Sequence, residues 1–409
     1  MASKIIVAQL GARMHYAIPE ILHKNNFLHT FFSDLYLNKS THHLLNQVNK
    51  IYPLDSLNKL LGRRNEALMG ANIDSFNASG IRYSFQAKLT KNPQEYIRQC
   101  NLMAKDFNQK ILSRGFGDAD TLYVFNTAGL ELIHHAKTLG IRVILEQTIA
   151  PFTIERVLME DELQKFPTWG RVNDYEMNDD FTEYIERELQ EQMLSDVIIC
   201  GSKFVKESIN EFSGQAQKTQ VIPYGINLPL PKCKEPWQKD KRKLRILTVG
   251  TGLRKGTPYI LEAAKKLKSI AEFRLIGSLE NMADAVKKEI TENIDCYGHI
   301  ARSAVNIHYE WADIFLLPSL CEGSATVTYE ALAFGVPVIA TANAGAIIEH
   351  NLDGLIVQQG SSDGIEQVIL FLYHKPENLE YLSRNALEKS QVGSLKAYER
   401  RLINLINSI

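Results

Sequence analysis

The chain has 409 residues, enough for two domains of about 150 to 200 residues each, and 45% of them are hydrophobic, sufficient for two full cores. Charged residues make up 23% and the net charge is −1, so the composition gives no reason to expect a nucleic-acid partner. No apolar run approaches the roughly 20 residues of a membrane-spanning helix, and the first residues predict a strand rather than a signal peptide. We therefore expect a soluble, cytoplasmic protein that is at most peripheral to a membrane.

The charges are distributed unevenly along the chain. Residues 1–100 contain 12 Lys and Arg against 6 Asp and Glu, whereas residues 151–200 contain 4 against 13. A basic first quarter suits an anionic membrane leaflet or an acidic acceptor, and equally a solvated surface without a partner. The cysteines lack metal-ligand spacing, which indicates free thiols in a reducing compartment and no metal site. They are Cys100, Cys200, Cys233, Cys296 and Cys321.

In the first half, short β-branched runs alternate with helical periodicity, which predicts a parallel sheet covered by helices. The predicted strands are 4–10, 28–36, 121–126, 142–147 and 196–202. The first strand ends at Gly11, where a tight turn into a helix needs the conformational freedom of glycine. Arg13 and His15 follow in this turn and are candidates to bind a phosphate group.

Residues 37–118 are the least regular part of the first half. Helices are predicted at 56–70 and 94–112, with Asn- and Ser-rich interruptions around them. The first of these helices mixes basic and apolar residues, namely Leu57, Lys59, Leu60, Leu61, Arg63 and Arg64. It could rest on an anionic leaflet, or it could bury its leucines in the domain core.

The strand at 142–147 carries two polar residues, Glu146 and Gln147, near its carboxyl end. Either side chain could line a cleft and hydrogen-bond a hydroxyl group. A buried carboxylate at a reaction centre also stabilises a carbon that develops positive charge. The competing interpretation is a structural Glu146 that pairs with a nearby Arg, and the sequence favours neither.

The second half repeats the alternating pattern after a linker at 226–243, which is rich in Pro and Lys and has no periodicity. The predicted strands are 244–250, 272–277, 294–298, 313–318 and 336–340. The final residues, 394–409, predict an amphipathic helix.

Two carboxylates eight positions apart, Glu322 and Glu330, follow the strand at 313–318. Between them, a turn of small residues leads into a helix: Gly323, Ser324, Ala325 and Thr326. A helix that begins in this way presents free N–H groups and the positive end of its dipole, a suitable site for a phosphate. The first carboxylate is then placed to meet sugar hydroxyls, and the second, two turns along, to meet a ribose.

This stretch resembles the donor-site signature of the retaining nucleotide-sugar glycosyltransferases of family 4, which have the GT-B fold. Those enzymes carry an E-x(7)-E motif that usually reads E-G-F-G-x-x-x-x-E. Here Ser324 replaces the Phe and Ala325 replaces the second Gly. Both changes are compatible with a helix start, because Ser is a good N-cap and Ala a good helix former. They leave the identity of the donor open.

The resemblance also implies roles for residues outside the motif in the second half. Arg254 and Lys255 follow the strand at 244–250, where many family members read G-R-L-x-x-x-K-G. Lys255 matches the family lysine and Arg254 stands in for the arginine, so both are expected to neutralise the donor diphosphate. Gly298 matches a loop whose backbone contacts the nucleotide base.

In the first half, Gly11 matches the family loop that closes over phosphate and acceptor, which makes Arg13 and His15 candidate acceptor-binding residues. Family members commonly place a His after the middle strand of this domain. That His is absent here, and Glu146 is the catalytic candidate in its place, beside Glu322.

The resemblance implies an α/β protein of GT-B fold, with two Rossmann-like domains facing each other across a cleft and a last helix that crosses back to the first domain. The expected parts are an acceptor-side domain at 1–225 with its irregular segment 37–118, the linker at 226–243, a nucleotide-sugar-binding domain at 244–390 and the crossover helix at 391–409.

The implied activity is transfer of a sugar from a nucleoside diphosphate sugar to a hydroxyl of a glycan or lipid-linked glycan precursor. By resemblance the transfer retains anomeric configuration and uses no metal or other cofactor. A nucleotide-sugar epimerase, a phosphorylase and an inactive GT-B binding subunit are the alternatives. The E-x(7)-E context and the lack of a pyridoxal phosphate lysine motif argue against the first two. The missing His and the altered motif keep the third open.

Overall fold

The structure is a computed structural model that describes residues 3–52, 54–90, 92–229, 236–239, 241–280 and 282–409. The chain folds into two compact units that interleave along the sequence. The first unit contains Met1–Gln147, Glu176–Ile199 and Ser213–Gln220. The second contains Thr148–Tyr175, Cys200–Phe212 and Val221–Ile409. A stretch from the first half of the chain therefore packs as part of the second unit.

The first unit is built on a seven-stranded sheet with the order β3-β2-β1-β4-β5-β6-β7. Its strands are β1 (Ile5–Gln9), β2 (Leu28–Ser33), β3 (Ile73–Ser75), β4 (Thr121–Phe125), β5 (Arg142–Gln147), β6 (Val197–Cys200) and β7 (Thr219–Val221). The pairings from β3 to β5 are parallel. Every residue of β1 and β4 is buried, as expected for a parallel sheet that is covered on both faces.

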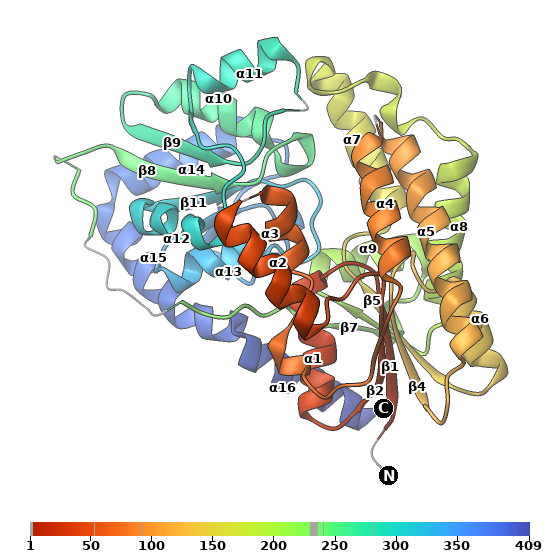
Figure 1. The fold of residues 1–409 in the computed structure, drawn as a ribbon. Helices are drawn as coiled ribbons and strands as arrows, with labels where there is room; N and C mark the ends of the chain where they lie inside the picture. The colour runs from red at the N-terminus through yellow and green to blue at the C-terminus, as the bar shows by residue number, and fades with distance from the viewer. Residues whose placement is uncertain (1–2, 53, 91, 230–235, 240, 281) are drawn as a thin grey trace. The chain divides into compact units, whose positions relative to one another are not determined.

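Helices of the first unit cover this sheet, and α4, α5, α6 and α8 pack against one another (Figure 1). The helices are η1 (Arg13–Tyr16), α1 (Ala17–Lys24), α2 (Lys39–Ile51), α3 (Asp55–Leu61), η2 (Glu66–Leu68), α4 (Asn77–Leu89), α5 (Pro93–Arg114), α6 (Leu130–Thr138), α8 (Asp179–Leu194) and η5 (Ala216–Lys218). Asn side chains begin two of the longest: Asn92 accepts from the N–H of Glu95, and Asn178 from that of Phe181.

The second unit has a six-stranded parallel sheet with the order β10-β9-β8-β11-β12-β13. Its strands are β8 (Leu244–Val249), β9 (Ala271–Ile276), β10 (Asp295–Cys296), β11 (Ile314–Leu317), β12 (Val338–Ala340) and β13 (Gly354–Ile356). Its helices are α7 (Phe152–Lys165), η3 (Pro167–Trp169), η4 (Val172–Tyr175), α9 (Lys203–Ser213), η6 (Leu253–Lys255), α10 (Thr257–Leu267), α11 (Asp284–Thr291), α12 (Arg302–Trp311), α13 (Thr326–Ala333), η7 (Ala342–Ala344), α14 (Ser362–His374), α15 (Pro376–Lys389), η8 (Ser390–Gly393) and α16 (Leu395–Ser408).

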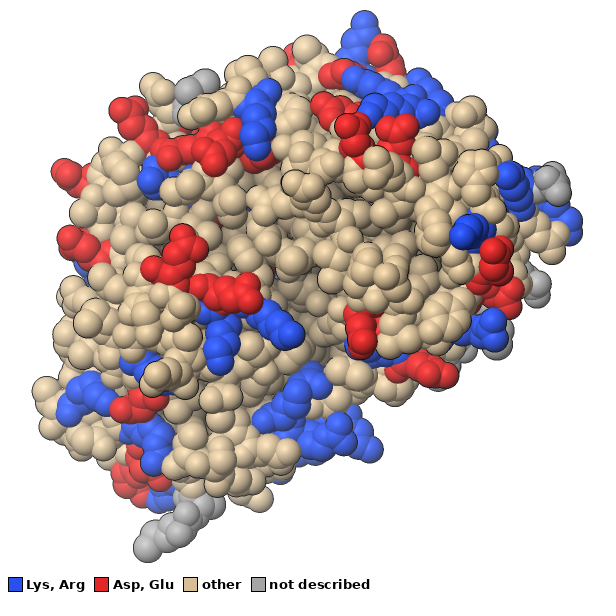
Figure 2. Space-filling view, turned by 180° about the vertical axis from the view of Figure 1, so that it is seen from behind, with Lys and Arg blue, Asp and Glu red and all other residues tan. Residues whose placement is uncertain are grey.

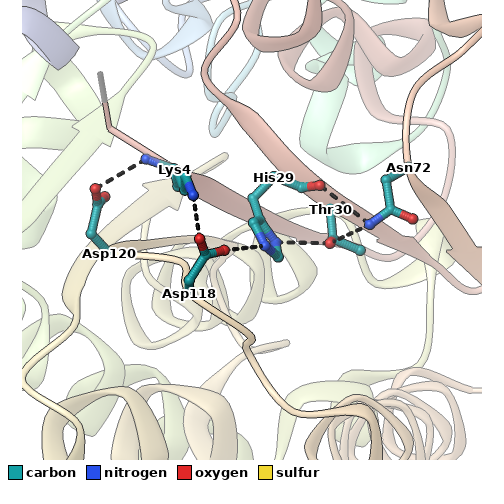
Figure 3. Close-up of polar contacts among 6 residues, drawn as sticks. All are labelled: Lys4, His29, Thr30, Asn72, Asp118 and Asp120. Atoms are coloured by element: carbon teal, nitrogen blue, oxygen red, sulfur yellow. Dashed lines mark hydrogen bonds and ion pairs between the residues drawn. The ribbon is translucent and has the colours of Figure 1, made fainter. Parts of the chain in front are cut away.

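Polar contacts connect the starts of four strands, β1 to β4, at the amino end of the first sheet (Figure 3). Asp118, just before β4, pairs with Lys4 before β1 and lies 3.0 Å from Nε2 of His29 in β2. The network runs through Asp120, Lys4, Asp118, His29, Thr30 and Asn72. Because ligands of open parallel sheets bind at the carboxyl ends of the strands, this network has a structural role.

The predicted fold class is confirmed, because both halves form parallel sheets covered by helices, and each of the ten predicted strands is present. The helix predicted at 56–70 is wrong in its extent: α3 ends at Leu61, and a loop with the 3-10 turn η2 follows. The loop residues Arg63 and Arg64 turn inward, toward Asp34 and the carbonyl of Leu37. The predicted domain boundaries stay predictions.

The last helix, α16, packs within the second unit through Tyr398 and Leu402, which are fully buried. Its crossing to the first domain and the facing of the two domains stay predictions. Of the predicted linker at 226–243, residues 230–235 and 240, and with them Cys233, lie outside the described residues. The cysteines Cys100, Cys200, Cys296 and Cys321 are free thiols.

Over the described residues, no helix is both long enough and apolar enough to cross a membrane. Figure 2 shows Lys and Arg side chains interspersed with Asp and Glu side chains on the face that it draws.

Candidate donor site in the second unit

The strand order places a binding position in each sheet. In the second unit, the chain leaves β8 toward β9 and β10 on one side, and leaves β11 toward β12 and β13 on the other. Ligands of open α/β sheets bind at such a reversal, beyond the carboxyl ends of the two central strands. The loops there are 250–256 after β8 and 318–325 after β11. They hold six of the candidate residues from the sequence, namely Arg254, Lys255, Glu322, Gly323, Ser324 and Ala325.

Arg254, Lys255 and Glu322 form one ion-pair cluster at this position. Nζ of Lys255 lies 2.6 Å from Oε1 of Glu322, and Nη1 of Arg254 lies 2.9 Å from the same oxygen. Nη1 of Arg254 also donates to the carbonyl oxygen of Cys321 at 2.8 Å. The exposed fractions of the Glu322 and Lys255 side chains are only 12% and 19%. Solvent therefore screens these charges less than it would on the surface.

Two glycines allow the loops of this cluster to pack closely. Gly256 has φ of +71°, and a Cβ there would lie 2.3 Å from the carbonyl oxygen of Pro318. A Cβ on Gly323 would lie 1.7 Å from the carbonyl oxygen of Thr148. The N–H of Leu320 donates to the carbonyl of Arg254 at 2.8 Å. The loop after β8 is thereby fixed against the loop after β11, which brings the cations to the carboxylate.

Ser324 lies in the turn but does not cap the helix, contrary to the expectation from its N-cap propensity. α13 begins at Thr326, and its N-cap is Ala325, which provides no side-chain cap. The hydroxyl of Ser324 is buried, contacts the hydroxyl of Tyr329 and accepts from the N–H of Tyr224 at 3.4 Å. The helix therefore starts with its first N–H groups uncapped by a side chain, near Glu322 in sequence.

Glu330 lies in the middle of α13 and receives a hydrogen bond that the sequence did not indicate. The hydroxyl of Tyr309 on α12 donates to Oε2 of Glu330 at 2.9 Å. The ring of Tyr309 is buried and stacks on Phe334 with 5.5 Å between the ring centroids. The carboxylate is therefore held in place by a rigid neighbour.

Glu155 is the main charged residue of the cluster that sequence reasoning missed. It lies in the first turn of α7, and its Oε1 is 3.7 Å from Nε of Arg254. Burial raises the pKa of Glu155, Arg254 lowers it and Glu322 raises it, with a net rise. Burial lowers the pKa of Arg254, but Glu322 and Glu155 more than compensate, so Arg254 remains a cation. The only sequence signal was an acidic residue soon after β5.

Gly298 follows β10 with φ of +62°, and its carbonyl accepts from the N–H of Gly277 at 2.8 Å. The side chain of His299 beside it is exposed. Among the described residues, no group of three or more His, Cys, Asp and Glu side chains is arranged to hold a metal ion.

The remaining candidates lie in the first unit, at the carboxyl end of β1. The N–H of Gly11 donates to Oδ1 of Asp34 at 2.9 Å. Arg13 and His15 are both exposed, and the guanidinium of Arg13 lies over the ring of Phe125 at 5.5 Å. This turn also adjoins a strand-order reversal, because β1 and β4 are neighbours whose chains continue to opposite sides.

The turn after β1 is strained. Met14, His15 and Tyr16 are consecutive and have φ of 47°, 52° and 66°, in the left-handed region that costs most residues about 1 kcal/mol or more. Asn65 holds the turn by donating to the carbonyl of His15 at 3.1 Å. Such strain is concentrated at functional sites, and no sequence pattern indicated it.

Glu146 is fully buried on β5, and the hydroxyl of Tyr123 donates to its Oε2. The partner in this contact is a tyrosine rather than the arginine of the structural interpretation. Gln147 is also buried and donates to Glu188 of α8 at 2.6 Å. The structure thus brings Arg254, Lys255 and Glu322 together. It places Gly11, Arg13, His15 and Glu146 in the other unit.

The family model of glycosyl transferases group 1 matches residues 231–389, which contain Arg254, Lys255, Glu322 and Glu330. An uncharacterized 41.2 kDa protein in the cps region of Klebsiella pneumoniae is 28% identical over 225 residues, 51% of this chain and 62% of that protein. Alpha-monoglucosyldiacylglycerol synthase of Streptococcus pneumoniae is 27% identical over 195 residues, 40% of this chain and 44% of that enzyme. The chain thus matches less than two thirds of the length of either relative.

Among solved structures, the Anabaena protein HepE in complex with UDP and glucose matches with a TM-score of 0.61 and 13% identity, and the match covers 100% of both chains. This likeness concerns the fold. The chain is thus similar to glycosyl transferases group 1 over residues 231–389, and it has the GT-B fold.

Proposed function

We propose that this protein is a glycosyltransferase that moves a sugar from a nucleoside diphosphate sugar to an acceptor hydroxyl. The observation that carries the proposal is the cluster of Arg254, Lys255 and Glu322 at the strand-order reversal of the second unit. Two partly buried cations beside the start of a helix suit a diphosphate, because charge-assisted hydrogen bonds to phosphate are strong. The structural relative with bound UDP and glucose supports this assignment.

In this proposal each part of the site binds a different part of the donor. Arg254 and Lys255 bind the diphosphate, Glu330 accepts hydrogen bonds from the ribose, and the loop at Gly298 contacts the base through its backbone. Glu322 meets the sugar and holds the two cations in register. Of the motif residues, Gly323 and Thr326 offer backbone groups. Ala325 serves the donor only indirectly, because its N–H donates to the carbonyl of Ala344 at 3.2 Å. Ser324 is also indirect, because its hydroxyl is buried in contact with Tyr329.

Two finer features are part of the proposal. Retention of anomeric configuration is favoured by the E-x(7)-E motif of the resembling family. Metal independence is favoured by the cations themselves, since they can neutralise the charge that develops on a leaving diphosphate. We likewise propose that the reaction uses no cofactor besides the donor. Activity that survives a chelator, and a product of the same anomeric configuration as the donor, would test these features.

The proposed acceptor is a glycan or a lipid-linked glycan precursor. The names of two relatives, one from a cps region and one a synthase of a glucosylated diacylglycerol, support this class. Acceptor contact is assigned to the strained turn of the first unit, where Arg13 and His15 are exposed. Glu146 remains a catalytic candidate, held by Tyr123 at the end of β5.

Peripheral contact with an anionic membrane on the cytoplasmic side is also proposed, with a revised set of residues. Arg63 and Arg64 pair internally with Asp34 and Glu66, so they are poorly placed to meet a membrane. α2 offers a better face, because Leu44, Val48 and Ile51 are exposed at helical spacing, with Tyr52 and Leu54 just beyond. Lys39 and Lys50 on the same helix are exposed and basic.

Sedimentation with anionic vesicles tests the membrane proposal. Binding should occur at low salt, weaken at high salt and be lost in a Leu44→Glu, Ile51→Glu variant. Leu139→Glu, at an exposed apolar site just after α6 in the same unit, is the control and should bind like the wild type. Failure to bind at low salt would remove membrane contact from the account.

The activity itself is tested with a panel of UDP-, GDP- and ADP-sugars, by measuring release of nucleoside diphosphate with and without glycan or lipid acceptors. Acceptor-dependent release from one donor supports a transferase. Interconversion of the donor sugar without transfer would indicate an epimerase. A folded protein that binds donors but releases nothing would indicate an inactive binding subunit.

A further inference from the structure

The stretch Thr148–Tyr175 comes from the first half of the chain but packs as part of the second unit. Met159 of α7 lies in the core that contains β8 and α10, and Glu162 accepts a 2.6 Å hydrogen bond from the hydroxyl of Tyr259 on α10. α7 also contacts η6, the turn that carries Arg254 and Lys255. The position of α7 over the donor-binding loop is therefore fixed by packing well away from the loop itself.

This packing places Glu155 beside Arg254 in the candidate donor site. The two cations of the site, Arg254 and Lys255, then face two carboxylates, Glu155 and Glu322. Glu322 lies 2.6 and 2.9 Å from the cations, whereas Glu155 lies 3.7 Å from Nε of Arg254. With both carboxylates ionised, the site has no net positive charge with which to attract a diphosphate. The longer, weaker Glu155 contact is the easier of the two to give up.

We propose that Glu155 is the internal counterion of Arg254 in the donor-free site, and that the donor diphosphate takes its place while Glu155 accepts a proton from solvent. The inference builds on the proposed function and adds a residue to it. Glu155 thereby sets the affinity for the diphosphate and makes that affinity depend on pH. The diphosphate then gains the guanidinium edge that Glu155 had occupied.

The groups around Glu155 agree with this exchange. Arg254 of η6 is the cation that faces it, and Glu322 and Cys321 after β11 and Tyr175 of η4 are the other titratable neighbours. Burial raises the pKa of Glu155, so its protonation is already made easier before a ligand arrives. The next residue along α7, Arg156, pairs with Glu160 at 2.5 Å and so has its own partner. A bound diphosphate would raise the pKa of Glu155 further, because like charges disfavour its ionised form.

The test is calorimetric titration of the whole chain with inorganic pyrophosphate and, separately, with UDP. Pyrophosphate presents the diphosphate without a base or a sugar, so it probes the cations directly. Each titration is made in mildly acidic and in mildly alkaline solution, and in two buffers of different ionisation enthalpy, which counts the protons taken up. The variants are Glu155→Gln, which removes the charge, and Glu160→Gln, a matched control on the same helix.

The wild type should take up more protons than Glu155→Gln when it binds pyrophosphate. The affinity of the wild type, divided by that of Glu155→Gln at the same pH, should fall as pH rises. In alkaline solution Glu155→Gln should bind about tenfold or more tightly than the wild type, the factor that corresponds to one pKa unit of linkage. Because the wild type and the variant are compared at equal pH, pyrophosphate has the same protonation state in both titrations and does not contribute to the difference in affinity. Glu160→Gln should behave as the wild type does.

A folded Glu155→Gln variant that binds pyrophosphate no more tightly than the wild type, with the same proton uptake, would overturn the exchange. Circular dichroism and the melting temperature establish whether the variant is folded. Glu155→Asp keeps the charge and should keep the pH dependence, which guards against a purely structural effect of the substitution. If the wild type binds neither pyrophosphate nor any nucleoside diphosphate, the proposed function itself fails, which is a distinguishable result.

Discussion

Oε2 of Glu330 accepts a 2.9 Å hydrogen bond from the hydroxyl of Tyr309, so α12 fixes the carboxylate that is assigned to the ribose. The ring of Tyr309 is itself held by stacking on Phe334. The site thus has a supporting residue whose removal should loosen a ligand contact without touching the ligand.

Glu330→Gln should weaken binding of the donor and of the free nucleoside diphosphate alike, because a charge-assisted hydrogen bond is worth about 1.5–3 kcal/mol. Tyr309→Phe keeps the stacked ring and should weaken the same binding by a smaller amount. Titration calorimetry of both folded variants measures the effect. Unchanged nucleotide affinity in Glu330→Gln would remove this carboxylate from the ribose site.

Glu322→Ala should leave nucleoside diphosphate binding intact or make it stronger, because Lys255 and Arg254 are both released from the Glu322 carboxylate. Turnover should fall by about a hundredfold or more, as expected for a group that acts chiefly in the transition state. Steady-state kinetics together with nucleotide titration separate the two effects. Glu377→Ala, at an exposed position on α15, is the control. Near-normal turnover in Glu322→Ala would shift attention to Glu146.

Burial raises the pKa of Glu191 to about 8, from an ordinary value of 4.5. The folded state therefore binds more protons than the unfolded state between these values, and the stability that Glu191 contributes is lost as pH rises from about 4.5 to about 8. Denaturant unfolding across this range should show a free energy of unfolding that declines with pH. Glu191→Gln should flatten the decline, whereas Glu183→Gln on the same helix should not.

Gly323→Ala should destabilise the second unit, because its Cβ would meet the backbone carbonyl of Thr148 at 1.7 Å. Overpacking of this kind costs about 1–3 kcal/mol, and here the neighbour is backbone that cannot rotate away. The matched control is Gly62→Ala, whose Cβ would lie in ordinary contact at 3.5 Å. Equal melting temperatures for the two variants would contradict the close approach of these loops.

The sequence predicted the longer strands because buried parallel strands are continuous apolar runs, as in β11, where all four residues are buried. β3, β7 and β13 have three residues each and were missed, because none of them continues an apolar run like the one at 336–340 that marks the equally short β12. Each is an edge strand of its sheet, where backbone pairing with the adjacent strand stabilises an extended conformation that the local sequence does not indicate.

The cluster of Arg254, Lys255 and Glu322 could be predicted because its cations are neighbours in one short loop and its carboxylate lies in another, and each loop carries a recognisable motif. Glu155 and Tyr309 could not, because each reaches the site through tertiary packing of a helix that has no motif. The prediction that Ser324 suits a helix cap was wrong, because local propensity does not show that its hydroxyl contacts the hydroxyl of Tyr329 instead. Local sequence motifs therefore identified the binding loops, whereas the residues that support these loops could be identified only from the tertiary packing.

The most direct test of the proposed transfer is release of nucleoside diphosphate from UDP-, GDP- and ADP-sugars in the presence of EDTA, by the wild type and by Lys255→Ala. The account predicts acceptor-dependent release from at least one donor despite the chelator, and a severe loss in Lys255→Ala, because this lysine pairs with Glu322 in the proposed diphosphate site. Release that needs added Mg²⁺ or Mn²⁺, or that is undiminished in a folded Lys255→Ala variant, would contradict it.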